Sequence, residues 1–414
     1  MEFLNLTAIL ITLSALFSYI NHRFIGLPTT IGVMLIALLL SLLLILIGEL
    51  GAARFENMAE RILRGVDFDV TLMHGMLSFL LFAGALHINL GDLRQQKWVI
   101  TILATVGVIL STMIVGVLTW IVLGWLGIGI PFIFCLLFGA LISPTDPIAV
   151  LATLKCVGIA KSLETKIAGE SLFNDGVGVV VFLVIAGLAM DPENVSVGTA
   201  ALLFFREAVG GILFGLALGY TGFFLLRSID NYQVEVLITL SLVTGGYAMA
   251  LALHTSGLIS IVVAGLLIGN RGRNLAMSDR TREHLDTFWE LVDEVLNAVL
   301  FVLIGLEVLV LQFTREYLIA GLLMIPVVMF ARTVSVGVPV NLLKLKLTGA
   351  FSPHVIKILV WGGIRGGISV ALALSLPPGP MRDIIVAMTY VVVVFSILVQ
   401  GLTIGKVAKR LAGY

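Results

Sequence analysis

Three acidic side chains stand within stretches that are otherwise apolar enough to cross a lipid bilayer. Asp146 lies in SPTDPIAVL, and Glu170 and Asp175 lie in GESLFNDGVG. A charged side chain near the centre of a bilayer costs roughly 2.5 to 3.5 kcal/mol, so such residues are rare and usually line an ion or proton path. Three of them so close together in the sequence predict a transport site.

The composition predicts an all-α polytopic membrane protein. Of the 414 residues, 59% are hydrophobic and 12% are charged, whereas an average soluble domain has about 25% charged residues. A helix needs about 20 residues to cross the hydrocarbon, and about thirteen such runs recur along the chain. Their approximate ranges are 4–22, 25–48, 72–90, 98–126, 131–154, 167–189, 198–226, 234–253, 255–270, 287–311, 316–343, 354–376 and 383–405.

The connections between these spans are too short for a soluble domain, so we expect one integral membrane unit over 1–414. The longest connection, 49–71, carries mixed charges and predicts a short interfacial helix. If the N-terminus is outside the cell, most of the 25 Lys and Arg residues fall in the loops on the inner side of the membrane. The positive-inside rule predicts such an excess in cytoplasmic loops. We expect a multi-pass protein of the cell membrane with a cytoplasmic C-terminus and an uncleaved first span.

Several function classes are not indicated. The net formal charge is zero, and the basic residues follow the topology, so no nucleic-acid partner is implied. Cys135 and Cys156 lack the clustered Cys or His partners of a metal site. We expect neither an enzyme nor a cofactor. The expected partners are the lipid bilayer and, from the residues considered below, monovalent cations and protons.

Two prolines bracket Asp146 and predict a break in the fifth span. Pro144 and Pro147 each remove a backbone donor and disfavour helical geometry in the preceding residue, so the helix should break near Thr145. A break exposes carbonyl oxygens, which are tolerated at this depth only beside protein or a water-filled cavity. Such oxygens suit a dehydrated cation. The alternative is a kinked helix with Asp146 buried and protonated.

The sixth span carries oxygen ligands at helical spacing. Ser171 and Asp175 share one helix face, and Glu170 and Asn174 share the neighbouring stripe. Hydroxyl, amide and carboxylate oxygens can therefore converge here. We expect a site for a hard monovalent cation on this span.

A third free carboxylate would carry charge that one cation could not balance, and Arg332 offers Glu170 a partner. Arg332 lies deep in MIPVVMFARTVSVGV, and a buried guanidinium requires a carboxylate. We expect a structural Glu170–Arg332 pair that leaves Asp146 and Asp175 for transport. Alternatively, Arg332 faces one of those aspartates and modulates the ion site.

A second poorly helical span surrounds Arg365 in WGGIRGGISVALAL. Broken helices at corresponding positions of two halves indicate an inverted repeat with a midplane site between them. We expect repeats over 1–190 and 231–414, joined by a linker helix within 191–230, with Arg365 compensating the carbonyl ends of the broken helices. The alternative is an interfacial arginine among packing glycines.

Asp293 and Glu294 lie near the start of the tenth span. They predict either attraction of cations to the inner mouth of the site or an ordinary interfacial helix start.

Four motifs, TDP, ESLFND, a deep FAR and GGIRGG, occur in this order, and their combination resembles the NhaP/NHE branch of monovalent cation:proton antiporters. The resemblance covers nearly the whole chain. It implies a homodimer, with a dimerisation domain and a six-helix core domain in each protomer. It also implies that broken helices five and twelve cross, and that access alternates by an elevator-like motion.

The resemblance also assigns roles by motif position. Asp175 would be the main cation and proton carboxylate, assisted in binding Na⁺ by Asp146, Ser171 and the Thr145 carbonyl. Asn174 would hold the helices together.

Further implications concern charge. Related antiporters that have two aspartates at the positions of Asn174 and Asp175 are associated with electrogenic exchange. The asparagine at position 174 therefore implies electroneutral exchange. Glu170 would pair with Arg332, as the residue argument also predicts. Some relatives carry an acid in the third span, where this chain has Ala83.

We therefore predict a secondary active transporter that exchanges Na⁺ or Li⁺ for H⁺. A K⁺/H⁺ antiporter of the same fold is the main alternative, because ligand types do not fix the size of the site. An intramembrane aspartyl protease is disfavoured because the Gly-x-Gly-Asp motif is missing. A cation channel is disfavoured because the carboxylates suit binding and release rather than throughflow.

Overall fold

The structure, a computed structural model, describes residues 2–48, 50, 75–190, 197–311, 314–346 and 354–412. Within these ranges it contains helices and turns but no strand. Eight of the described helices are long and apolar enough to cross a membrane, and three shorter apolar helices accompany them. The predicted all-α multi-pass architecture is confirmed. The interfacial helix predicted over 49–71 lies outside the described residues except at Leu50.

The helices follow the predicted spans. In chain order they are α1 (Glu2–Ile20), η1 (Asn21–Ile25), α2 (Thr29–Ile47), α4 (Leu77–His87), α5 (Leu90–Gln95), α6 (Lys97–Ile102), η4 (Leu103–Gly107), α7 (Val108–Trp125), α8 (Phe132–Ile142), α9 (Ile148–Val157), α10 (Lys161–Met190), α11 (Val197–Arg227), α12 (Tyr232–Ala252), α13 (Gly257–Leu267), η5 (Ile268–Gly272), α14 (Arg273–Leu275), α15 (Asp279–Leu306), η6 (Glu307–Leu309), α16 (Arg315–Lys346), α17 (Val355–Trp361), α18 (Gly367–Leu374), α19 (Pro380–Phe395), η7 (Ser396–Gln400) and α20 (Gly401–Ala412). The helices α10 and α15 begin earlier than predicted because their first turns are polar, which an apolar pattern does not detect.

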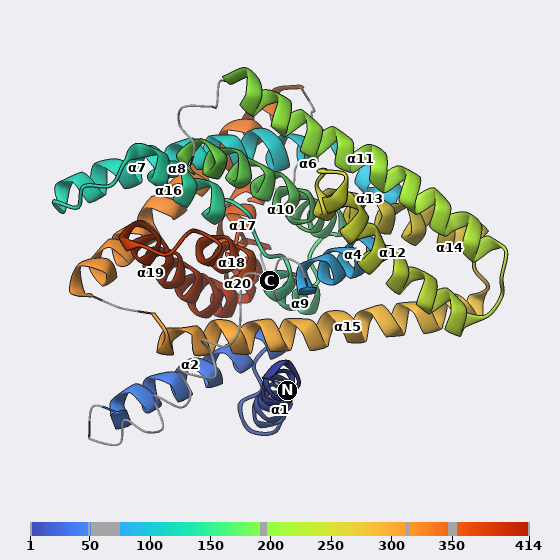
Figure 1. Cartoon of the computed structure of the whole chain (residues 1–414), viewed down its shortest axis with the longest axis horizontal. Helices are drawn as coiled ribbons and strands as arrows, with labels where there is room; N and C mark the ends of the chain where they lie inside the picture. Colours follow the sequence, from blue (N-terminus) through green and yellow to red (C-terminus); the bar gives the residue numbers. More distant parts are fainter. Residues whose placement is uncertain are drawn as a thin grey trace.

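The helices form one bundle, in which α10 contacts helices from both halves of the chain. Figure 1 shows α15 running along one side of it, between α1 and α2 on the outside and the helices that surround α9 and α18 on the inside. Large apolar side chains such as Leu213 and Phe224 of α11 and Leu237 of α12 are exposed on the outside. Lipid tails are as apolar as leucine, so this exterior suits a bilayer.

Two helices are broken, and their breaks meet inside the bundle. The first break separates α8, which ends at Ile142, from α9, which begins at Ile148, and the second separates α17 from α18. The backbone N–H of Asp146 donates to the carbonyl oxygen of Ile364 at 2.7 Å. This bond joins one break to the other, and it confirms the predicted pair of crossing broken helices.

Arg365 connects the second break to the carbonyl end of α8. Its Nη1 donates to the carbonyl oxygen of Ser143 and, at 2.9 Å, to that of Pro144. Arg365 is 1% exposed, and its backbone N–H donates to Ser396 Oγ at 2.9 Å. The C-terminal end of a helix carries partial negative charge on its unsatisfied carbonyls. The guanidinium therefore offers both hydrogen bonds and a compensating charge where the helix stops.

Replacing Arg365 by leucine should destabilise the protein, because two buried carbonyl oxygens would lose their donor. Each orphaned carbonyl should cost about 1 to 3 kcal/mol. The check is the thermal unfolding midpoint in detergent, with Arg315→Leu at an exposed position as the matched control. An Arg365→Leu midpoint equal to that of the control would contradict this account of the break.

Candidate functional site

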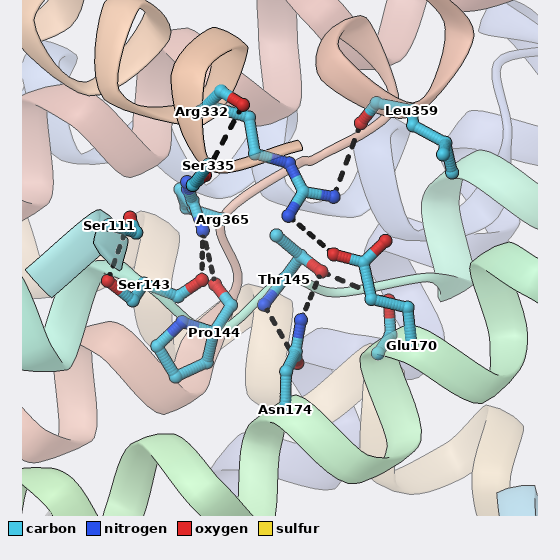
Figure 2. Close-up of polar contacts among 11 residues, drawn as sticks. Ser111, Ser143, Pro144, Thr145, Glu170, Asn174, Arg332, Ser335, Leu359 and Arg365 are labelled. Atoms are coloured by element: carbon cyan, nitrogen blue, oxygen red, sulfur yellow. Dashed lines mark hydrogen bonds and ion pairs between the residues drawn. The ribbon is translucent and has the colours of Figure 1, made fainter. Parts of the chain in front are cut away.

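Thr145, at the first break, is held against α10 by a small buried network. Its backbone N–H donates to Asn174 Oδ1 at 3.3 Å, and Asn174 Nδ2 donates back to Thr145 Oγ1 at 2.9 Å (Figure 2). Thr145 Oγ1 also lies 3.1 Å from Ser171 Oγ. All three residues are at most 3% exposed. The broken segment, which has no helix of its own to satisfy it, thus takes its partners from the neighbouring helix.

Asp146 and Asp175 approach one cavity from different elements. The cavity has a volume of about 480 Å³, and Thr145 also lines it. Asp175, on α10, is 6% exposed, whereas Asp146, in the break, is half-buried. Two carboxylates on one cavity repel each other when both are ionised. A cation between them would relieve that repulsion, so the arrangement favours cation binding.

A glycine of the second break allows Asp146 to come close to the backbone. A Cβ atom at Gly366 would lie 2.5 Å from Asp146 Oδ2, which no real side chain could tolerate without displacement of the carboxylate. The missing side chain at Gly366 in the second broken helix therefore leaves room for the Asp146 carboxylate.

Glu170 and Arg332 form a buried ion pair beside these aspartates. Arg332 Nη1 lies 2.5 Å from Glu170 Oε1, and the two side chains are 9% and 2% exposed, respectively. Arg332 Nη2 also donates to the carbonyl oxygen of Leu359 in α17 at 3.3 Å (Figure 2). A Cβ at Gly363 would lie 2.6 Å from Arg332 Nε. The pair thus connects α10, α16 and the second broken helix.

The structure sorts the predicted site residues into two groups. Thr145, Asp146 and Asp175 line the cavity, whereas Ser171 and Asn174 are not among its lining residues. The hydroxyl of Ser171 and the amide of Asn174 instead contact Thr145. In this conformation the oxygens expected to converge on one ion are partly used to hold the break.

Other polar residues of the cavity wall were not predicted as site residues. Asn297 of α15 and Ser369 of α18 both line the cavity. Asn297 was recognisable in principle, since it is a lone amide in the apolar run VLNAVLFVLIGL. Ser369 follows the glycines of GGIRGG in a sequence that carries no comparable signal.

Comparison with known proteins decides the family. The family described as sodium/hydrogen exchanger, transmembrane, matches residues 11–410. The chain belongs to this family. It is 52% identical over 411 residues to the Na⁺/H⁺ antiporter NhaP of Pseudomonas aeruginosa. The alignment covers 99% of this chain and 97% of NhaP. The chain is 34% identical over 389 residues to the Na⁺/H⁺ antiporter NhaH of Halobacillus dabanensis, with 93% and 92% covered.

The fold of this family member is also that of a solved antiporter. The sodium proton antiporter MjNhaP1 from Methanocaldococcus jannaschii, solved at pH 8, superposes with a TM-score of 0.80 over 100% of both chains, at 20% sequence identity. The antiporter fold predicted from the sequence is confirmed. The family consists of transporters rather than enzymes.

The buried pair should show strong energetic coupling. Glu170→Gln or Arg332→Met alone should lower the free energy of unfolding by roughly 3 to 5 kcal/mol, because the remaining charge stays buried and uncompensated. The double variant should lose less than the sum of the two. Thermal unfolding in detergent measures all three variants.

The pair Asp279–Arg282, 3.0 Å apart, provides the control, because Asp279 is fully open to solvent and Arg282 is only half-buried. Its coupling should be about 1 kcal/mol or less. Additive losses at Glu170 and Arg332 would show that their contact contributes no coupling energy.

Proposed function

We propose that this protein exchanges Na⁺, or Li⁺, for H⁺ across the cell membrane by alternating access. The observation that carries the proposal is the pair Asp146 and Asp175 on one cavity beside crossing broken helices. The relatives NhaP and NhaH, named as Na⁺/H⁺ antiporters, support the choice of ions. Half-helix ends and unwound backbone at such a crossing are suited to cation coordination.

The two substrates compete for the same oxygen atoms. A carboxylate that holds a proton cannot at the same time offer its full charge to a cation, so binding of one substrate displaces the other. Asp175 is the main exchanging carboxylate in this proposal, with Asp146, Ser171 and the Thr145 carbonyl assisting. The hydroxyl of Ser171 would have to turn from Thr145 toward the ion, because it does not line the cavity in this conformation.

We also propose that exchange is electroneutral, with one proton for one cation. Glu170 is engaged by Arg332, and Asn174 adds no titratable group beside Asp175. The carrier then crosses the membrane with the same charge in both directions.

The architecture around this site belongs to the proposal as well. Residues 1–190 and 231–414 form inverted repeats joined by a linker within 191–230, and the presence of one broken helix in each half supports this division. The functional form is a homodimer with its N-terminus outside the cell and its C-terminus in the cytoplasm. The excess of basic residues on one set of loops supports that orientation.

Asp175→Asn should abolish exchange, because the amide keeps the shape but cannot release a proton or neutralise a cation. The assay is dissipation of an imposed pH gradient in proteoliposomes on addition of Na⁺, Li⁺ or K⁺ in turn. Asp383→Asn, at an exposed acid on α19, is the matched control. For the unaltered protein the apparent Na⁺ affinity should weaken as the pH falls, since protons then occupy more of the sites. Normal exchange by Asp175→Asn would refute the assignment.

A further inference from the structure

The helix α15 brings an acid and an amide to the cavity one turn apart. Asp293 and Asn297 both line it. Asn297 is 2% exposed, and its Nδ2 donates to the carbonyl oxygen of Asp293 at 2.8 Å. Its Oδ1 has no hydrogen-bond partner within the part of the chain that the structure describes. The amide is thus oriented by its own helix, and its acceptor oxygen is left without a protein partner in a residue that lines the cavity.

A second unpartnered oxygen comes from α18. Ser369 lines the same cavity, is 1% exposed, and its Oγ likewise has no partner among the described residues. The start of α18 packs directly on α15, since a Cβ at Gly367 would lie 2.6 Å from Leu300 Cδ1. Buried polar atoms without protein partners are uncommon in native proteins, and binding an ion or a water molecule is one way to satisfy them.

Electrostatics connects these residues to the exchange site. Asp293, Asp146 and Asp175 all line this one cavity. Carboxylates that share a cavity repel one another when they are ionised. A cation bound beside any of them relieves that repulsion.

We propose that Asp293, Asn297 and Ser369 form a second cation-binding station, which a partly dehydrated monovalent cation occupies on its way to Asp146 and Asp175. The proposal rests on the proposed exchange function, because it gives the transported ion a stop before the exchange site. A carboxylate, an amide oxygen and a hydroxyl replace hydration oxygens around the ion, as protein oxygens do in ion pathways. Glu290 and Glu294 also line this cavity, but both are exposed and lack the buried, unpartnered oxygens of Asn297 and Ser369, so they are not part of the station.

The first test is anomalous scattering from crystals of the full chain soaked in Tl⁺, an electron-rich monovalent cation. The station predicts a peak between the Asp293 carboxylate and Asn297 Oδ1, separate from a peak at Asp146 and Asp175. In crystals of Asn297→Leu the first peak should vanish while the second remains. A peak at the aspartates alone, with water density at Asn297, would overturn the station and leave the proposed function standing. No peak at either place would contradict both.

The second test is transport, because an uncharged substitution cannot change long-range attraction. In proteoliposomes Asn297→Leu should raise the apparent KM for Na⁺ about tenfold, the effect of losing one good ligand, with little change in maximal rate. Ser369→Ala should shift KM in the same direction. Glu290→Gln, one turn before Asp293 on α15, should change KM by about twofold or less, because exposed charges are screened by salt.

These variants separate the station from simple attraction of cations to an acidic mouth. Simple attraction predicts equal effects of Asp293→Asn and Glu290→Gln and none of Asn297→Leu. An unchanged KM in Asn297→Leu, in a protein with an unaltered thermal midpoint, would refute the station. Absence of any alkali-cation exchange in the unaltered protein would instead refute the exchange function on which it depends.

Discussion

The contact between the two helix breaks is the constraint on which the rest of the site depends. A backbone that leaves its helical geometry at this depth must find partners inside the protein, because lipid offers none. Here the partners come from the other break, through Asp146 N–H and the Ile364 carbonyl, and from the guanidinium of Arg365. Thr145 is fixed in turn by Asn174. These bonds stabilise the two breaks and so fix the position of Asp146 on the cavity.

The buried charges then divide into structural and exchangeable groups. Glu170 and Arg332 neutralise each other across α10 and α16, and Arg365 faces the carbonyl end of α8. Asp146 and Asp175 lie on the cavity and are the groups that the proposed exchange uses. The same packing that stabilises the bundle therefore sets how much charge is left for transport.

The sequence predicted the breaks and most of the charged site because those features have local causes. Pro144 and Pro147 interrupt a helix wherever it packs, and a deep Arg332 requires a carboxylate in any fold. The sequence did not predict that Asn297 and Ser369 line one cavity, since that depends on the packing of α15 on α18. The direction of the Ser171 hydroxyl also depends on tertiary contacts. Helical spacing predicts the helix face on which Ser171 lies, but it does not predict the residue that the hydroxyl contacts.

The charge division has a direct electrical consequence. If Asp146 and Asp175 swap one proton for one cation, no net charge crosses the membrane, whereas each extra charge would feel about 2.3 kcal/mol per 100 mV. The decisive measurement uses proteoliposomes with a valinomycin-set potential and finds the Na⁺ gradient that just balances a given pH gradient. One-for-one exchange at Asp146 and Asp175 predicts that this balance point stays fixed as the potential is varied. A systematic shift with potential would show that more than one proton moves per cation and would contradict it.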